Sequence, residues 1–228
     1  MVKVGDIPIR LQMVTPVNQF QDKVIRAMYA ELTKKLQSQA FQQSIRRGTK
    51  QALEKALRAQ PEYQSMVMQD GKLRAELGVV DSTSAMESLV RDWVRSTTVH
   101  VARPRIVGGR ILGTIISVKA IQADYDDVLQ KAYASYTTEK GAIIPWLDWL
   151  LTKGEAIMIQ SHQIFHPAPP TARSRTQTNT IMKKTKGQGW GVPEEFSGTP
   201  DNNYATRAVA MAMPEIGQMI EAEVRRRL

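Results

Sequence analysis

Two apolar, β-branched runs flank the glycine pair Gly108-Gly109, and no other stretch restricts the possible folds of this chain as strongly. The first run is TVHVARPRIV and the second is RILGTIISVKAI. Two consecutive glycines supply the positive φ angles that a tight antiparallel turn requires. Counting back from the turn gives a register that pairs Val107 with Arg110, Val101 with Ile116, and Val99 with Val118. The sequence therefore predicts a β-hairpin whose base is apolar.

The tip of this predicted hairpin is basic. Arg103, Arg105 and Arg110 lie on the same face as the apolar pairs, but closer to the turn. Pro104 has no amide hydrogen to donate to a sheet and therefore favours an edge position. Two interpretations of this basic tip remain open at this point. It is either a solvated end of the hairpin or a loop that contacts a partner.

Helical periodicity is typical of much of the remaining chain, because apolar residues recur there at spacings of three and four. The predicted helices run from Pro16 to about Gln43, from Gly48 to the residue before Pro61, from Ser84 to near Ser96, from Pro145 to Leu151, and from Asp201 or Asn202 onward. Ser84 and Glu87 fit a capping box at the start of the third helix. The predicted core face of the last helix is Val209, Met213, Ile216, Ile220 and Val224.

These patterns together predict the α+β class, with a small antiparallel sheet that includes the hairpin and is packed by long helices. Short strands are expected within residues 2–12 and 157–162. A chain of 228 residues suits one domain with appendages. We assign residues 1–165 and 200–228 to this domain, with an N-terminal helical part at 16–60. Residues 166–199 are assigned to an extended arm or loop.

The segment 166–199 is too long and too polar for an ordinary connection, since loops beyond about 12–15 residues are usually functional or disordered. It nevertheless contains apolar side chains that are costly to leave in water. We therefore interpret it as an arm whose first part, His166 to Lys186, finds its partner outside its own domain, while Trp190 to Thr199 packs on its own domain. The candidates for a subunit interface are Arg173, Arg175, Ile181, Met182, Lys183, Trp190 and Phe196.

The composition narrows the possible partners and chemistry. The formal net charge of +9 favours nucleic acid, an anionic membrane or an acidic protein as a partner, although scattered basic runs are also typical of solvated helix faces. The absence of cysteine excludes disulfide scaffolds and thiol catalysis. No run approaches the length of a membrane span and the start does not look like a cleavable leader, so we expect a soluble chain.

The sequence predicts no catalytic site, cofactor site or metal site. His162 and His166 are four residues apart in an extended segment, which is too far for two ligands of one ion. The adjacent carboxylates Asp126 and Asp127 diverge and do not form a natural acid and base pair. Binding surfaces are therefore the remaining candidates for function.

Several strings in this chain resemble the neck or tail-completion proteins of tailed bacteriophages, which join the head to the tail. In order they are KLRAELGVVD, the glycine hairpin, DYDDVL, KGAIIPWLDWLL, SRTQTNTIM and GWGVPEEFSGTPDNNYATRA, which together fall within residues 72–212. The specific part is the PWLDWLL helix followed by the W-x-VP-x-x-F-x-GT pattern. The chain departs from the family at TARSRTQTNTIM, where relatives are richer in glycine, and at YATRA.

The resemblance implies a structural virion protein without turnover, located at the head-tail junction and assembled in the host cytoplasm. It implies a homo-oligomeric ring of six or twelve copies between a head connector or portal-proximal protein and a tail terminator or tail tube protein. Arg103, Arg105 or Arg110 would then line a DNA channel and contact genomic DNA transiently and non-specifically. The alternative hypothesis, which rests on the net charge, is a basic DNA-binding or DNA-packaging accessory protein.

Overall fold

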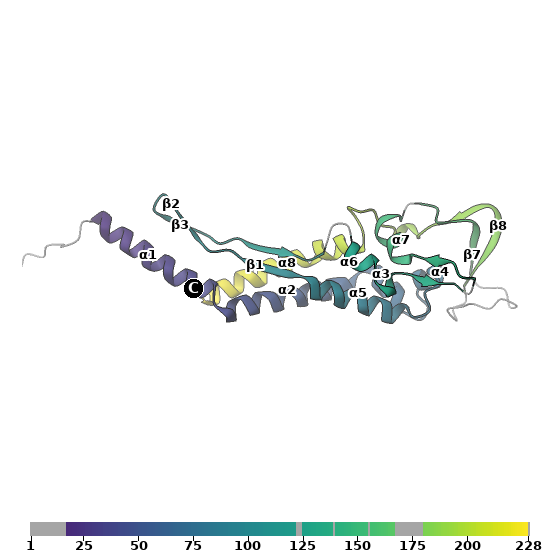
Figure 1. Cartoon of the computed structure of the whole chain (residues 1–228), viewed down its shortest axis with the longest axis horizontal. Coiled ribbons are helices and arrows are strands. Elements are labelled where there is room, and N and C mark those ends of the chain that lie inside the picture. The colour runs from purple at the N-terminus through teal and green to yellow at the C-terminus, as the bar shows by residue number, and fades with distance from the viewer. Residues whose placement is uncertain (1–16, 122–124, 139, 155, 167–179, 228) are drawn as a thin grey trace, which may run out of the picture.

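The molecule is elongated, with a helix and a hairpin at one end and a compact cluster of short elements at the other (Figure 1). A computed structural model describes residues 17–121, 125–138, 140–154, 156–166 and 180–227. The strand predicted within residues 2–12 lies outside these residues. The predicted α+β class is confirmed, because eight α-helices accompany four separate two-stranded antiparallel ladders in the described residues.

The α-helices are α1 (Val17–Leu36), α2 (Gln39–Ala59), α3 (Pro61–Val67), α4 (Lys72–Leu77), α5 (Ser82–Ser96), α6 (Asp126–Leu129), α7 (Trp146–Thr152) and α8 (Tyr204–Arg227). The 3-10 turns are η1 (Ala132–Ala134) and η2 (Glu194–Phe196). The strands are β1 (Thr98–Val101), β2 (Arg105–Val107), β3 (Arg110–Leu112), β4 (Ile116–Lys119), β5 (Tyr136–Thr137), β6 (Ile143–Ile144), β7 (Ile159–Phe165) and β8 (Ile181–Trp190).

The predicted single helix from Pro16 to about Gln43 and the predicted interruption at Gly48 are both wrong. The chain breaks after Leu36, where Ser38 accepts a hydrogen bond from the Phe41 amide at 3.3 Å and so caps α2. Helix α2 then passes through Gly48 without interruption to Ala59. A side chain at Gly48 would lie within 3 Å of Met219 in α8, so this glycine serves the packing of two helices.

Helices α2 and α8 form the long axis of the molecule and lie against each other (Figure 1). After the buried Tyr204 at its start, the next buried positions of α8 are small, namely Ala205, Ala208 and Ala212. The predicted core face of α8 is therefore only partly right, because Ile216 is buried but Met213 is 51% exposed. Alanines allow the α8 backbone to approach α2 closely, and the longer methionine points away.

Helix α5 has the predicted apolar face and the predicted end. Met86, Leu89, Val90 and Trp93 are buried, and the helix ends at Ser96. The predicted capping box is wrong, because α5 already begins at Ser82 and Glu87 accepts hydrogen bonds from Arg58 and Tyr63 instead. Contacts with residues far away in the sequence therefore hold the Glu87 side chain, which the local sequence pattern had predicted to cap the helix.

The predicted hairpin register is confirmed at each of the three pairs that the sequence specified. Gly108 and Gly109 form the turn with φ angles of 57° and 71°. The ladder is interrupted around Pro104, yet β1 and β4 on one side and β2 and β3 on the other keep a common register. The hairpin is thus one continuous projection with a break in its hydrogen bonding.

The interpretation of residues 181–186 as an arm that leaves its own domain is wrong within the single chain. These residues belong to β8, which pairs antiparallel with β7 from the preceding segment. The register runs from Phe165 opposite Ile181 to Ile159 opposite Trp190, with an irregularity beside Ser161. The segment 167–179 lies outside the described residues.

Candidate assembly surface

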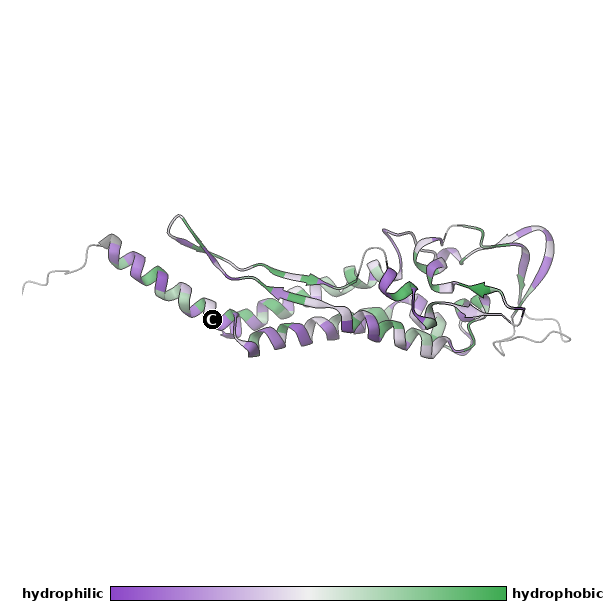
Figure 2. Cartoon of the chain, in the orientation of Figure 1, coloured by the Kyte–Doolittle hydropathy of each residue, from purple (hydrophilic) through white to green (hydrophobic). Residues whose placement is uncertain are grey.

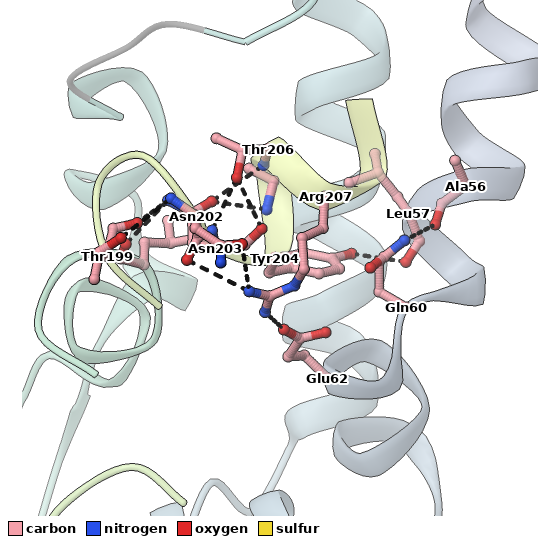
Figure 3. A network of polar contacts seen from close by, with 12 residues as sticks. Ala56, Leu57, Gln60, Glu62, Thr199, Asn202, Asn203, Tyr204, Thr206 and Arg207 are labelled. Atoms are coloured by element: carbon pink, nitrogen blue, oxygen red, sulfur yellow. Dashed lines mark hydrogen bonds and ion pairs between the residues drawn. The ribbon is translucent and has the colours of Figure 1, made fainter. Parts of the chain in front are cut away.

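Three of the strings that carry the resemblance, DYDDVL, KGAIIPWLDWLL and GWGVPEEFSGTPDNNYATRA, meet at a buried junction around Asn203. Figure 3 shows the polar contacts of Asn203 and its neighbours in this junction. Asn203 is fully buried and caps α8, because its Oδ1 accepts from the amides of Ala205 at 3.0 Å and Thr206 at 3.2 Å. The backbone amide of Asn203 donates to the Thr206 hydroxyl at 2.8 Å. The two residues form a reciprocal cap in which threonine replaces the usual glutamate.

The side-chain nitrogen of Asn203, Nδ2, links three further segments to this cap. Nδ2 donates to the carbonyl oxygens of Leu151 at 3.0 Å and Thr199 at 2.8 Å, and to the hydroxyl of Tyr125 at 2.8 Å. Leu151 belongs to α7, so this one side chain holds the last turn of α7 against the start of α8. The sequence missed it because the cap was expected at Asp201 or Asn202.

Close backbone contacts explain Gly198 of the last string and Gly154, which follows α7. A side chain at Gly198 would lie 2.6 Å from the Leu150 carbonyl oxygen, and one at Gly154 would lie 2.2 Å from the Gly198 nitrogen. The Gly154 amide donates to the Gly198 carbonyl at 3.0 Å. These glycines are required because two backbone segments touch, which is a structural role.

Trp190 and Phe196 were candidates for a subunit interface, and the structure corrects this assignment. They are only 6% and 8% exposed and belong to the core of their own chain. The Trp190 indole donates to Glu76 at 2.9 Å and its ring lies 6.1 Å from that of Trp149. Burial raises the pKa of the Glu76 carboxyl, and the hydrogen bond from Trp190 opposes that rise. The interpretation that Trp190 to Thr199 anchors on its own domain is confirmed.

The other interface candidates have mixed outcomes. Ile181 and Met182 are partly buried in β8, where Met182 packs against the main core. Lys183 is exposed on the same strand, opposite Gln163. Arg173 and Arg175 lie outside the described residues. The β7–β8 ladder therefore offers Lys183 as an accessible candidate, while the apolar members partly serve their own chain.

Helix α1 projects from the end of the molecule and has two apolar sides (Figure 1). One side carries Leu32 and Leu36, which pack with Phe41 and the base of the hairpin. The other side carries Phe20, Val24 and Met28, which are 55%, 39% and 60% exposed. These three residues recur at every fourth position and so form one continuous stripe. This stripe is thus largely open, whereas the stripe of Leu32 and Leu36 packs against the described chain.

The outer part of the hairpin lies beside α1 and is also apolar and exposed (Figure 2). We define the projecting end as α1 together with residues 103–115. Among the thirteen exposed large apolar side chains in the described residues, seven lie in the projecting end. They are Phe20, Val24, Met28, Ile106, Val107, Leu112 and Ile115. Such a concentration of exposed apolar side chains marks an interaction site.

The projecting end is basic as well as apolar. Its charged side chains are Asp22, Lys23, Arg26, Glu31, Lys34, Lys35, Arg103, Arg105 and Arg110, seven basic against two acidic. None of them forms an ion pair with another described residue. By contrast, Arg225, Arg226 and Arg227 pair with Glu221 or Glu223 in the same helix. The structure brings Arg103, Arg105 and Arg110 together on an exposed surface, as the hairpin register predicts.

An apolar groove of about 700 Å³ lies along the middle of the molecule, between α2, α8 and β4. Leu53, Val118, Val209 and Met213 are among its lining residues. The buried hydroxyl of Thr49 also lines it and has no hydrogen-bond partner among the described residues. The groove is separate from the projecting end, and neither surface was recognised as apolar and open in the sequence.

The described residues contain no group of three or more side chains arranged to hold a metal ion. Among the described helices, none is long and apolar enough to cross a membrane. Comparison with protein-family models, with curated proteins and with solved structures finds no match to this chain.

Proposed function

We propose that this chain is a structural protein of the bacteriophage neck. In this function it forms a ring that joins the head connector to the tail and contributes to the DNA channel. The observation that carries the proposal is the projecting end, where exposed apolar residues and unpaired charges lie on a helix and a hairpin that extend from the body. A surface of this kind suits permanent assembly with other protein subunits, because apolar side chains supply most of the free energy of association.

The family resemblance supports the same function from a different part of the chain. Its specific residues surround Asn203 and Gly198, where they hold α7, α8 and the connecting segment together. The resemblance therefore rests on a fold-defining junction, while the assembly surface lies at the opposite end. In the proposed ring, Arg103, Arg105 and Arg110 on exposed positions would meet DNA phosphates if the hairpin tips face the channel.

Location in the particle tests this proposal directly. We expect virions purified from a host that carries the gene to contain the chain at one position only, the head-tail junction, when imaged by electron microscopy with a tagged copy. A particle that lacks the chain, or carries it along the tail or over the head, would contradict the proposal. A null mutant should accumulate filled heads and complete tails that remain separate.

A substitution in the projecting end gives a sharper version of the same test. Val107→Asp places a charge on an exposed apolar position of the hairpin tip and should leave the fold intact while separate heads accumulate. Ile143→Asp is the matched control, because Ile143 is similarly exposed but lies in β6, outside the projecting end. Deleting residues 170–198 is not a clean alternative, since that deletion removes Trp190 and Phe196 from the core.

The second candidate function is a basic DNA-binding or DNA-packaging accessory protein. The observation that favours it is the seven basic side chains of the projecting end, which have no acidic partner among the described residues. Binding by these residues should be independent of DNA sequence and weaken steeply with salt. A gel shift at physiological ionic strength that Arg105→Ala weakens would support this function, and no shift would contradict it.

A further inference from the structure

We infer that α1 of one copy packs along the exposed face of the β2–β3 hairpin in the next copy, so that each subunit gives a helix to one neighbour and a hairpin to the other. This inference rests on the proposed function for the existence of a ring and adds the contact that builds it. The occupant of the exposed surface is thus a second copy of this chain.

The first observation is that α1 has a covered and an uncovered apolar side. Ile25, Tyr29 and Leu32 are half-buried on the side that faces its own body, and Leu36 is buried. Phe20, Val24 and Met28 form the adjacent, exposed stripe. A helix that met only its own body would need one stripe, so the second stripe indicates a second partner.

The second observation is that the hairpin also has two unequal faces. Cross-strand pairing places Arg105 opposite Leu112 and Val107 opposite Arg110, so these four side chains share one face. All four are exposed, and Val107 and Leu112 are 56% and 49% exposed. On the alternate positions, Pro104 is buried and Ile111 is half-buried, while Ile106 is 41% exposed. The face that carries Arg105 and Val107 is therefore the more open face of the hairpin.

The third observation is a carboxylate on the open stripe of α1 that can face the arginines of the open hairpin face. Glu31 follows Met28 by three positions and Val24 by seven, which places its carboxylate on the uncovered stripe of α1. Glu31 has no ion-pair partner among the described residues, and the same holds for Arg105 and Arg110. Packing the stripe on the hairpin face brings the carboxylate toward these guanidinium groups, while Phe20, Val24 and Met28 cover the apolar residues between them.

Charge also argues against the other arrangements of the same surfaces. Two hairpin faces in contact would oppose Arg105 and Arg110 with their own copies, and like charges across an interface are strongly unfavourable. DNA would satisfy the arginines but would leave Val107 and Leu112 without apolar partners. A helix-to-hairpin contact pairs different surfaces of the two copies. A head-to-tail contact of this type closes into a ring when its rotation permits.

Cysteine crosslinking tests the contact, because the chain contains no cysteine of its own. We expect the double variant Met28→Cys with Val107→Cys to give a ladder of oligomers on a non-reducing gel after mild oxidation. A mixture of the two single variants should stop at dimers, and each single variant alone should stay monomeric. The control pair is Ile143→Cys with Ile157→Cys, two exposed residues outside the projecting end, which should give no ladder.

Charge reversal gives an independent readout in solution. Glu31→Arg should weaken self-association about tenfold in sedimentation equilibrium, and adding Arg110→Glu should restore most of it. All of these side chains are exposed, so circular dichroism should show that each variant folds. Rings that form without the Met28 and Val107 crosslink would overturn this contact and leave the proposed function standing. A chain that stays monomeric at hundreds of micromolar would overturn the contact as well.

If the wild-type chain instead remains monomeric but joins virions at the neck, the proposed function holds and the helix-to-hairpin contact fails. If Arg105→Ala abolishes DNA binding while Glu31→Arg changes no association constant, the open face of the hairpin serves nucleic acid, and the inference fails in favour of the second candidate function. Dimers from Met28→Cys alone would indicate that two α1 helices pair, which also contradicts the contact.

Discussion

Replacing Asn203 with aspartate changes one nitrogen atom to oxygen at the most connected buried side chain of the junction. The acceptor Oδ1 is retained, and aspartate is as good a helix cap as asparagine, so the bonds to the Ala205 and Thr206 amides survive. The donor is lost. The new oxygen faces the carbonyl oxygens of Leu151 and Thr199 within 3.0 Å, with no hydrogen to place between them.

The magnitude follows from counting the groups that lose their partner. The buried carbonyl oxygen of Leu151 loses its donor, which costs about 1–3 kcal/mol, while the part-buried carbonyl oxygen of Thr199 keeps the Asn202 amide as a second donor at 3.1 Å. A carboxylate at a fully buried position adds a desolvation cost of several kcal/mol. We expect Asn203→Asp to lower the free energy of unfolding by about 4–6 kcal/mol, a large fraction of the roughly 5–15 kcal/mol typical of a domain. Asn203→Ala removes the cap as well but introduces no charge, and should cost about 3 kcal/mol.

Urea denaturation followed by far-ultraviolet circular dichroism measures these differences. Asn202→Ala is the matched control, because among the described residues the side chain of this exposed neighbour bonds only to Arg207, and its loss should cost below about 1 kcal/mol. Equal midpoints for wild type and Asn203→Asp would refute the reasoning. A larger loss in Asn203→Ala than in Asn203→Asp would show that the cap, and not the amide donor, dominates at this position.

Three further changes have definite expected outcomes. Glu87→Gln should cost about 1 kcal/mol at pH 7, because the hydrogen bond from Arg58 at 2.7 Å lowers the pKa of the Glu87 carboxyl. That stabilisation is present above the unfolded pKa and should disappear in denaturation curves as the pH falls below about 4. Arg207→Met leaves the fully buried carboxylate of Glu62 unpaired and should cost about 3 kcal/mol by urea titration. Gly198→Ala should lower the thermal midpoint by several degrees, because its methyl group meets the α7 backbone.

Each of these expectations has an outcome that contradicts it. A difference between wild type and Glu87→Gln that persists at pH 3 would show that the carboxyl acts by shape and not by charge. Adding Glu62→Gln to Arg207→Met should recover part of the loss, and an unchanged loss would place the effect elsewhere. For Gly198, an alanine variant as stable as the wild type would mean that the junction adjusts without cost.

The hairpin was predictable from the sequence because its determinants are local. A Gly108-Gly109 turn allows one register, and the alternation of apolar residues agrees with it, so turn and strands give the same answer. The face of α5 and the burial of the α7 helix were predictable for a similar reason, since period and apolar content are properties of one segment. The strand pairing of residues 181–190 was not, because β7 precedes it beyond a long connection and Gly187 and Gly189 weaken the strand pattern.

The misread helices show how tertiary contacts override local signals. Glycine is a residue type typical of helix ends, yet Gly48 lies within α2. A side chain at this position would collide with Met219 of α8. Ser38 ends one helix and caps the next without any proline or glycine nearby. The candidate site was only half predictable. The sequence identified Arg103, Arg105 and Arg110, but the exposure of Phe20 and Met28 depends on where α1 points relative to the body.

The common register of the two hairpin ladders has a mechanical consequence. Cross-strand partners alternate between the two faces, so inserting or deleting one pair of residues would turn Arg105 and Val107 to the opposite face. A change of two pairs would keep the faces and alter the length by about 7 Å. If the faces are kept, the length of the hairpin can therefore change only in steps of two residue pairs. A related chain that spans a wider or narrower gap should differ in hairpin length by multiples of four residues.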